Sequence, residues 1–195
     1  MLASPHDSSA VAENGGGSLD AMPTLVRDPQ PAEFEALLEH RRSRGQDRFD
    51  EVWEGVYHMN PAPSFEHQRV SQQLAELLGP LARAAGLEPA IGGVNIGRAE
   101  DFRIPDGSLH RPGASGTWLA TAALAIEIVS PGDETWDKLA FYAAHRVDEF
   151  LIVDLERRQA QWLVLDDAGE YKSVERSNLI ELGAAELAER LDWPK

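Results

Sequence analysis

The chain of 195 residues contains no cysteine, which excludes disulfide bonds, thiolate zinc sites and a cysteine nucleophile. It also lacks any apolar run near the roughly 20 residues that a membrane-spanning helix needs. The first residues have neither a basic start nor the apolar core of a secretory signal. We therefore expect a cytoplasmic protein that does not associate with a membrane.

Basic residues are scarce, because 18 Lys and Arg stand against 33 Asp and Glu, and the formal net charge is −15. This charge argues against a broad electrostatic grip on nucleic acid, which needs a basic surface. It does not exclude a nuclease, since an acidic metal site concentrates negative charge where a cation will bind. The 43% apolar and 26% charged residues are typical of a globular protein.

Two regions differ in composition. Residues 1–23 are rich in Ser, Ala, Gly and Pro and cannot bury enough apolar surface to offset the entropy cost of ordering, so they predict a disordered N-terminal tail. Residues 24–195 predict one folded domain.

Helical periodicity and turn residues organise the first half of this domain. A short helix is expected from Pro31 to Gly45, followed by a β-hairpin that turns at Glu54-Gly55. Ser64 is a plausible N-cap of a second helix. Its inward face is predicted by the spacing of apolar residues, which are Val70, Leu74, Leu77, Leu78 and Leu81.

The second half alternates strands and helices. The expected strands are LEPAIGGVNIG, DFRIPDGSLH, ALAIEIVSP, EFLIVDL and the hairpin AQWLVLDD with EYKSVER. A helix capped by Asp133 or Thr135 should run through Val147, with core residues Trp136, Leu139, Ala143 and Val147, and AAELAERLDW should form a final helix. The order predicts an α/β (α+β) fold in which helices flank a mixed sheet.

Glu127 is an acid inside the nearly unbroken apolar run ALAIEIV. A carboxylate in a central strand is costly unless it is paired or binds a metal. Its small alanine neighbours leave space beside it, which suits a site. The alternative is a solvated face or a buried salt bridge.

Asp106 and Lys138 are the other candidates for chemistry. Asp106 follows Pro105 on the strand before the one with Glu127, and antiparallel pairing would bring both carboxylates within range of one hard cation such as Mg²⁺. Lys138 lies one helical turn from Tyr142, and near a metal-bound water it could stabilise hydroxide or a phosphoryl transition state. Taken alone, it would be a solvated helix lysine.

These residues lie in a pattern that resembles the PD-(D/E)XK nuclease superfamily, and within it the Uma2 (DUF820) type. The pattern comprises IPD at 104–106, IEIVSP at 126–131 and DETWDKLAFYAAHRVDEFLIVD at 133–154. The segment FDEVWEGVYHMNPAPSFEHQ, from Phe49, is similar to the family's opening hairpin and helix start. The resemblance implies a restriction-endonuclease-like core and cleavage of phosphodiester bonds in nucleic acid, expected to be DNA, with Mg²⁺ or Mn²⁺.

The resemblance also implies roles for individual residues. Asp106 and Glu127 match the two acidic metal ligands, and the carbonyl of Ile128 is a further ligand. The superfamily's lysine usually lies two residues after the second acid, where this chain has Val129. Lys138 matches the lysine that the Uma2 type supplies from the next helix.

Further residues match the family less specifically. His67 and Gln68 correspond to the polar start of the first core helix, and His67 could bind a phosphate or orient a water. An interior histidine paired with a carbonyl is an equal alternative. Glu54 and Tyr142 could line the site or be purely structural.

Two rivals to a nuclease stay open: a catalytically inactive binding or scaffold protein with the nuclease fold, and a metal-dependent hydrolase of a small phosphorylated substrate. The one basic run, Arg41, Arg42, Arg44 and Arg48, could follow a phosphate backbone or be a solvated helix end. A homodimer would suit cleavage of two strands.

Overall fold

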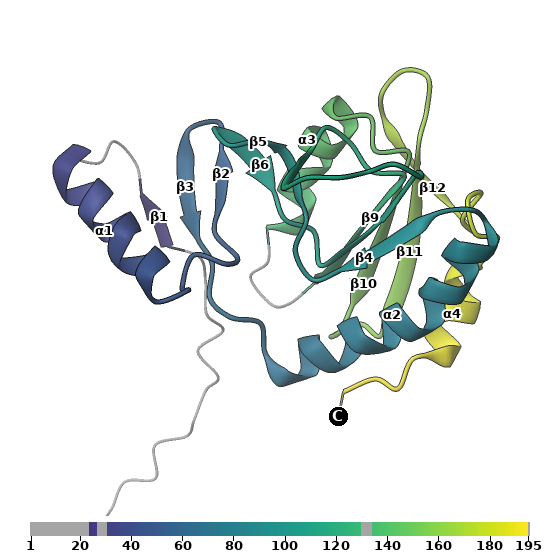
Figure 1. Cartoon of the computed structure of the whole chain (residues 1–195). Coiled ribbons are helices and arrows are strands. Elements are labelled where there is room, and N and C mark those ends of the chain that lie inside the picture. Colours follow the sequence, from purple (N-terminus) through teal and green to yellow (C-terminus); the bar gives the residue numbers. More distant parts are fainter. Residues whose placement is uncertain (1–23, 27–30, 130–133, 195) are drawn as a thin grey trace, which may run out of the picture.

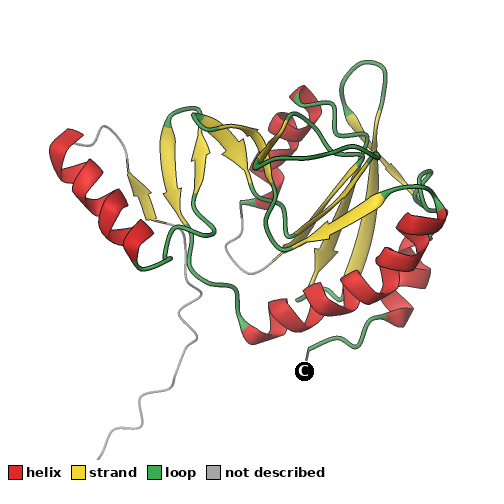
Figure 2. Cartoon of the chain, viewed as in Figure 1, coloured by secondary structure: helices red, strands yellow, loops and turns green. Residues whose placement is uncertain are grey.

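The computed structural model describes residues 24–26, 31–129 and 134–194, and the predicted tail of residues 1–23 lies outside them. Its elements form two sheets with helices packed against them (Figures 1 and 2). In chain order they are β1 (Thr24–Val26), α1 (Pro31–Ser43), β2 (Glu51–Trp53), β3 (Val56–Met59), α2 (Phe65–Ala84), β4 (Glu88–Ile91), β5 (Asn95–Arg98), β6 (Asp101–Arg103), β7 (Gly107–His110), β8 (Trp118–Leu119), β9 (Leu124–Val129), the 3-10 turn η1 (Thr135–Lys138), α3 (Leu139–Ala144), β10 (Glu149–Asp154), β11 (Gln159–Leu165), β12 (Tyr171–Val174) and α4 (Ala184–Arg190).

Among the residues that the structure describes, each sheet has six strands. The N-terminal sheet has the order β1-β3-β2-β6-β5-β8, and the central sheet the order β12-β11-β10-β9-β7-β4. In the central sheet β9 and β10 are parallel, whereas β7 pairs with β9 in antiparallel fashion. The predicted α/β fold with mixed strands and flanking helices is confirmed, with the strands divided between two sheets.

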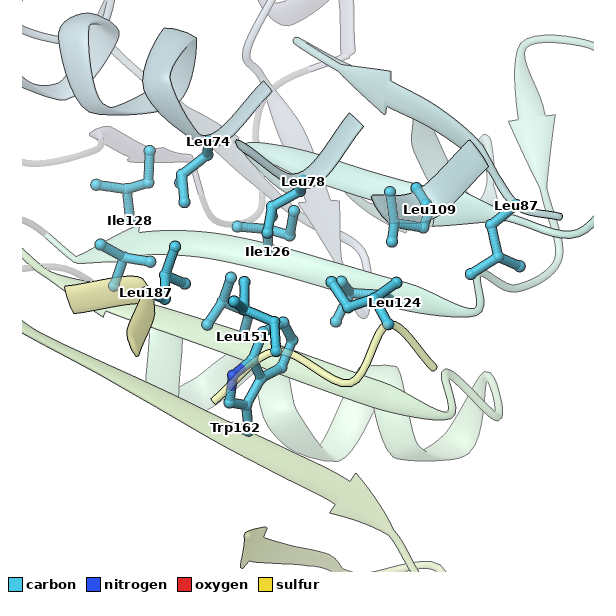
Figure 3. Close-up of a cluster of buried hydrophobic side chains, with 14 of the residues drawn as sticks. Leu74, Leu78, Leu87, Leu109, Leu124, Ile126, Ile128, Leu151, Trp162 and Leu187 are labelled. Atoms are coloured by element: carbon cyan, nitrogen blue, oxygen red, sulfur yellow. The ribbon is translucent and has the colours of Figure 1, made fainter. Parts of the chain in front are cut away.

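One face of the central sheet packs on α2 and α4 and forms an apolar core (Figure 3). Helix α2 starts where Ser64 accepts a hydrogen bond from the His67 N–H, and the predicted apolar stripe turns Val70, Leu74 and Leu78 into the core. Burial of each such leucine contributes about 2 kcal/mol.

The opposite face of the central sheet packs on α3 and on the N-terminal sheet. Side chains alternate along β9, so Ile126 and Ile128 join the α2 core while Ala125 joins Phe141, Tyr142 and other residues on the other side. Glu127 shares the face of Ala125. Its carboxylate therefore lies on the side of α3, away from the fully apolar core.

The structure corrects two expectations. The segment DFRIPDGSLH is two strands, because Ile104-Pro105-Asp106 separates β6 in the N-terminal sheet from β7 in the central sheet. Trp136, predicted in the core, is 53% exposed. The chain enters the helix through a 3-10 turn, whose tighter winding turns Thr135 and Lys138 inward instead. The predicted Asp133 cap lies outside the described residues.

Two further expectations differ from the structure. The segment LEPAIGGVNIG is divided between β4 in the central sheet and β5 in the N-terminal sheet, because Gly92 and Gly93, with φ angles of 93° and 102°, break the strand. The helix predicted to run through Val147 ends at Ala144, and Thr135 lies inside η1 instead of capping it.

The turn at Glu54-Gly55 joins β2 and β3, with φ angles of 49° and 83° that fit a two-residue hairpin. Helices α1 and α4 and the hairpin of β11 and β12 lie where the sequence predicts them. Among the helices of the described residues, none combines the length and hydropathy required to span a bilayer.

Candidate functional site

Asp106 lies at the bend directly before β7, and Glu127 lies in the neighbouring strand β9. β7 and β9 pair Gly107 with Ile126 and Ser108 with Ala125, so Asp106 lies one residue beyond the last pair of this register. Its carboxylate contacts β9 at Ile128, the residue after Glu127. The break at Pro105 leaves Asp106 just before β7, where its carboxylate is partly exposed.

The Asp106 carboxylate is oriented by two donors. Its Oδ2 accepts a hydrogen bond from the Ile128 N–H at 2.7 Å and lies 3.1 Å from the His67 Nε2. His67 reaches it from the first turn of α2, which the Ser64 cap fixes in place. The structure thus brings His67 to the first acid, where its contact is with a carboxylate.

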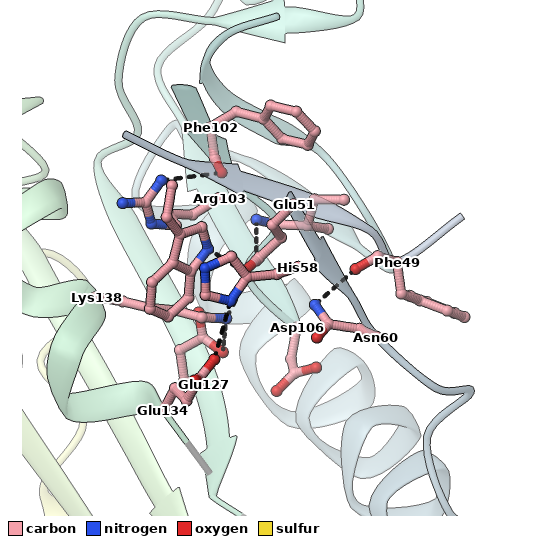
Figure 4. A network of polar contacts seen from close by, with 12 residues as sticks. Phe49, Glu51, His58, Asn60, Phe102, Arg103, Asp106, Glu127, Glu134 and Lys138 are labelled. Carbon is pink, nitrogen blue, oxygen red and sulfur yellow. Dashed lines mark hydrogen bonds and ion pairs between the residues drawn. The ribbon is translucent and has the colours of Figure 1, made fainter. Parts of the chain in front are cut away.

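Glu127 is 3% exposed and lies beside Lys138 (Figure 4). Tyr142 is its other neighbour. The Lys138 Nζ is 3.1 Å from Oε1 and 3.2 Å from Oε2, and the Tyr142 hydroxyl donates to Oε1 at 2.9 Å. Lys138 and Tyr142 come from η1 and α3 and are one helical turn apart, as their spacing predicts. Burial, with the charges of Glu127 and Glu51, raises the pKa of Tyr142 well above its ordinary value, so the phenol keeps its proton and donates.

Glu51 is a member of this cluster that sequence reasoning missed. It opens β2, is 1% exposed, and its Oε1 lies 3.2 Å from the Lys138 Nζ (Figure 4). Its oxygens also accept from the Ile104 N–H at 2.6 Å and the Trp53 Nε1–H at 2.7 Å. The only sequence signal is an acid at the start of a half-apolar strand, which is common on solvated strands too.

An aromatic stack holds the β2–β3 hairpin against η1 and α3. The Trp53 ring stacks on His58 with 4.1 Å between centroids, and the Arg103 guanidinium lies 4.5 Å from Trp53 and 4.1 Å from Phe141. The His58 Nδ1 is 3.2 Å from a Glu134 oxygen. Burial lowers the pKa of His58 against the opposing effect of Glu134.

Other predicted residues lie apart from these acids. Gln68 is exposed, and the hydrogen bond given for it runs from its backbone N–H to the Ser64 carbonyl. Glu54 is exposed in the hairpin turn, where its N–H donates to the Asp101 Oδ1 at 3.2 Å. Among the described residues neither side chain contacts Asp106 or Glu127.

The basic run also has structural contacts. Arg41 forms a two-point ion pair with the buried Asp50, at 2.9 Å from Nε and 2.6 Å from Nη2, and the Tyr57 hydroxyl bonds the same carboxylate. Arg42 is paired with Glu39 at 3.2 Å. The Arg41 contacts fasten α1 to the hairpin, the Arg42 pair lies within α1, and both favour the structural interpretation of this run.

The atoms available as ligands are oxygens, the type of ligand that Mg²⁺ prefers. Asp106 and Glu127 offer carboxylate oxygens, and the Ile128 carbonyl is the adjacent main-chain oxygen. Within the ranges that the structure describes, no group of three or more His, Cys, Asp or Glu side chains is placed to hold one metal ion. A cation here would therefore have few protein ligands and keep several waters, which is the coordination that Mg²⁺ favours.

Comparison with known proteins identifies the family. The Uma2 family, described as "Putative restriction endonuclease", matches residues 31–190. The chain belongs to the Uma2 family. Its structure is similar to the crystal structure of a protein from Anabaena variabilis described as "a putative nuclease belonging to DUF820", with a TM-score of 0.60 and 13% identity over 72% of this chain and 90% of that one.

A second similarity of this Uma2 protein is weaker. The cryo-EM structure of the DrdV–DNA complex matches with a TM-score of 0.36 and 19% identity, over 64% of this chain and 12% of that one. No curated protein matches. The similarity to the Anabaena protein, at 13% identity, shows the fold alone.

Proposed function

We propose that this protein is a metal-dependent endonuclease that hydrolyses phosphodiester bonds of nucleic acid. One observation carries the proposal: a buried glutamate and a buried lysine meet on a strand whose next residue, Ile128, donates a hydrogen bond to the Asp106 carboxylate. Burial of such charged groups is costly, and a functional site is one reason for a protein to keep them together. Membership of the Uma2 family supports the same chemistry.

Asp106, Glu127 and the Ile128 carbonyl would hold Mg²⁺ or Mn²⁺. A bound cation would supply Lewis-acid activation of a water and of the scissile phosphate. In hydrolysis the water oxygen bonds to phosphorus, the bond to the leaving oxygen breaks, and that oxygen takes up a proton.

The chain's own residues would orient and balance charge in this reaction. Lys138 places an ammonium beside the Glu127 carboxylate, where it can stabilise negative charge on the phosphoryl oxygens. Tyr142 holds Glu127 from the other side, and His67 with the Ile128 N–H holds Asp106. These contacts fix the rotamers of both acids before any substrate arrives.

Two exposed aromatic residues suggest the kind of nucleic acid. Phe65, the first residue of α2, is 73% exposed, and Trp136, two residues before Lys138, is 53% exposed. Exposed aromatic rings stack on unpaired bases without needing basic side chains. With a net charge of −15, this favours a single-stranded or locally unpaired substrate over a long duplex.

The test is metal-dependent nicking of single-stranded and plasmid DNA. We expect cleavage with Mg²⁺ or Mn²⁺ by the wild type and none by Asp106→Asn or Glu127→Gln. Glu149→Gln, which changes a buried acid at the other end of the sheet, should cleave like the wild type. Equal cleavage by the wild type and the Asp106→Asn/Glu127→Gln double variant would refute the proposal.

A second candidate is a binding protein that has kept the nuclease fold without activity. The observation that favours it is the engagement of both Glu127 oxygens by Lys138 and Tyr142, which is also how a structural ion pair would look. Calorimetry with Mn²⁺ distinguishes the two, because only the nuclease requires binding that depends on Asp106 and Glu127.

A further inference from the structure

Glu51 is anchored independently of the acids that the family resemblance singles out. It belongs to the N-terminal sheet, whereas Glu127 belongs to the central sheet. The Ile104 N–H and the Trp53 indole hold its two oxygens at 2.6 and 2.7 Å, and its side chain is 1% exposed. These contacts hold the carboxylate in place without any contribution from Lys138.

Lys138 lies between Glu51 and Glu127. Its Nζ is 3.2 Å from the Glu51 Oε1, 3.1 Å from the Glu127 Oε1 and 3.2 Å from the Glu127 Oε2. The ammonium is therefore drawn almost equally toward both carboxylates. We propose that Glu51 is a positioning residue of the candidate site, which shares the Lys138 ammonium with Glu127 and fixes its place between the two carboxylates; this inference rests on the proposed nuclease function.

The charges of these three buried groups explain why the position matters. Two carboxylates and one ammonium leave an excess of one negative charge within the group. Because Glu51 shares the lysine, Glu127 is only partly neutralised and keeps attraction for a cation. Without Glu51, the ammonium would neutralise Glu127 alone, and the attraction of Glu127 for a cation would be weaker.

Glu51 also acts on the segment that carries Asp106. The Ile104 N–H that binds Glu51 precedes Asp106 by two residues, at the break between β6 and β7. One carboxylate of the hairpin thus touches both the lysine and the approach to the first acid. This is the geometry expected of a residue that aligns its neighbours.

The experiment uses the small number of lysines. The chain has three, Lys138, Lys172 and Lys195, so ¹⁵N-lysine labelling gives few side-chain ammonium signals in NMR. Burial between carboxylates slows proton exchange and should make the Lys138 ammonium visible, with Lys138→Arg as the assignment control. Glu51→Gln should shift this signal or remove it.

Titration with Mn²⁺ alone supplies the second measurement. We expect Glu51→Gln to bind Mn²⁺ about 10- to 100-fold more weakly than the wild type, the usual effect of losing a residue that supports a metal site. Glu149→Gln is the matched control, because Glu149 is an equally buried acid, 2% exposed, whose partners include Ser177 and Asn178. It should change neither the Lys138 signal nor the Mn²⁺ affinity.

The two measurements separate the inference from the proposed function. A Lys138 signal that is the same in the wild type and Glu51→Gln, while thermal unfolding shows both folded, overturns the positioning role. An altered signal in Glu51→Gln but not in Glu149→Gln supports it. If the wild type binds no Mn²⁺, the nuclease proposal fails, while the ammonium signal still decides whether Glu51 positions Lys138.

Discussion

Glu127 and Glu149 are buried acids on adjacent parallel strands, and they are stabilised in different ways. Glu149 accepts hydrogen bonds from the Ser177 hydroxyl at 2.5 Å and from the Asn178 and Leu179 N–H groups at 2.7 and 3.2 Å. Glu127 is held by an ammonium and a phenol. The hydroxyl and N–H groups around Glu149 come from one loop, so this carboxylate anchors that loop. The pair of Glu127 with Lys138, close to a second acid, is an arrangement expected of a catalytic site.

Glu149 and Glu127 also lie at different positions along their strands. Glu149 pairs with Leu124, at the amino end of both strands, while Glu127 pairs with Ile152, nearer the carboxyl end. In α/β sheets, ligands bind beyond the carboxyl ends of parallel strands. Two acids with similar burial therefore have different expected roles, and variants at the two ends can test that difference.

The largest expected effect is on catalysis by Glu127→Gln. Glutamine keeps the size of the side chain and the Tyr142 hydrogen bond but loses the charge that a cation needs. Nicking should fall by at least about 10³-fold, the scale on which loss of a single charge-stabilising group acts. Gel assays of nicking with Mn²⁺ measure it, and thermal unfolding should show that the variant stays folded.

Lys138→Met should have the largest effect on stability. It leaves Glu51 and Glu127 buried without the ammonium between them, and removal of one partner from a buried ion pair costs about 3–5 kcal/mol. Urea unfolding measures the loss. The control is Lys172→Met at an exposed lysine, which should change stability by less than about 0.5 kcal/mol. Equal stability of the two variants would mean that the buried cluster contributes little.

Glu149→Ala should destabilise the protein without affecting nicking. The Asn178 and Leu179 N–H groups would lose their acceptor, which costs about 1–3 kcal/mol for buried polar groups. Urea unfolding and the nicking assay check both parts. A loss of nicking in folded Glu149→Ala would remove the distinction between the two ends of the strands.

The pH dependence of stability should also depend on Glu149. Burial, the largest influence, raises its pKa above the ordinary value of 4.5, although Ser177 and two N–H groups oppose the shift. A folded-state pKa above the unfolded one stabilises the protein below pH 4.5, and this stabilisation is lost as the pH rises through the raised pKa. Glu149→Gln should therefore gain stability relative to the wild type across that interval, as measured by urea unfolding at several pH values.

The smallest expected effect is that of Trp136→Ala on binding of single-stranded oligonucleotides. Loss of one aromatic ring on which a base can stack should weaken binding by about 1 kcal/mol, which is the lower end of the range for base–aromatic stacking. Fluorescence anisotropy with the Glu127→Gln protein, which does not cut the probe, measures it. Trp118→Ala is the control, because Trp118 is 41% exposed on β8 of the N-terminal sheet. A similar loss in both variants would assign no special role to Trp136.

The sequence predicts the elements that depend on local patterns. The apolar stripe of α2 and the Ser64 cap, the Glu54-Gly55 turn and the apolar runs of β9 and β10 are all local signals, and the structure has each of them. The division into two sheets has no such local signal. The segment predicted as one strand is interrupted at Pro105, and its two halves belong to different sheets. Which strands pair with each half depends on contacts far away in the chain.

As with the fold, the sequence predicted those parts of the candidate site that depend on local patterns. Asp106, Glu127, Lys138 and Tyr142 follow from strand order and helical spacing, and the structure brings the last three together. Glu51 could not be found in this way, because its contact with Lys138 depends on how the two sheets pack. The prediction for Trp136 was wrong because it assumed the 3.6-residue period of an α-helix, whereas this segment is a 3-10 turn with three residues per turn.

The central claim is that Asp106 and Glu127 bind one divalent cation, and a crystal soaked in Mn²⁺ tests it most directly. An anomalous difference map should show one manganese peak bound by both carboxylates and by the Ile128 carbonyl, and the peak should be missing from Glu127→Gln crystals. A fully soaked crystal with no peak there, and with Lys138 still bound to Glu127, would contradict the claim.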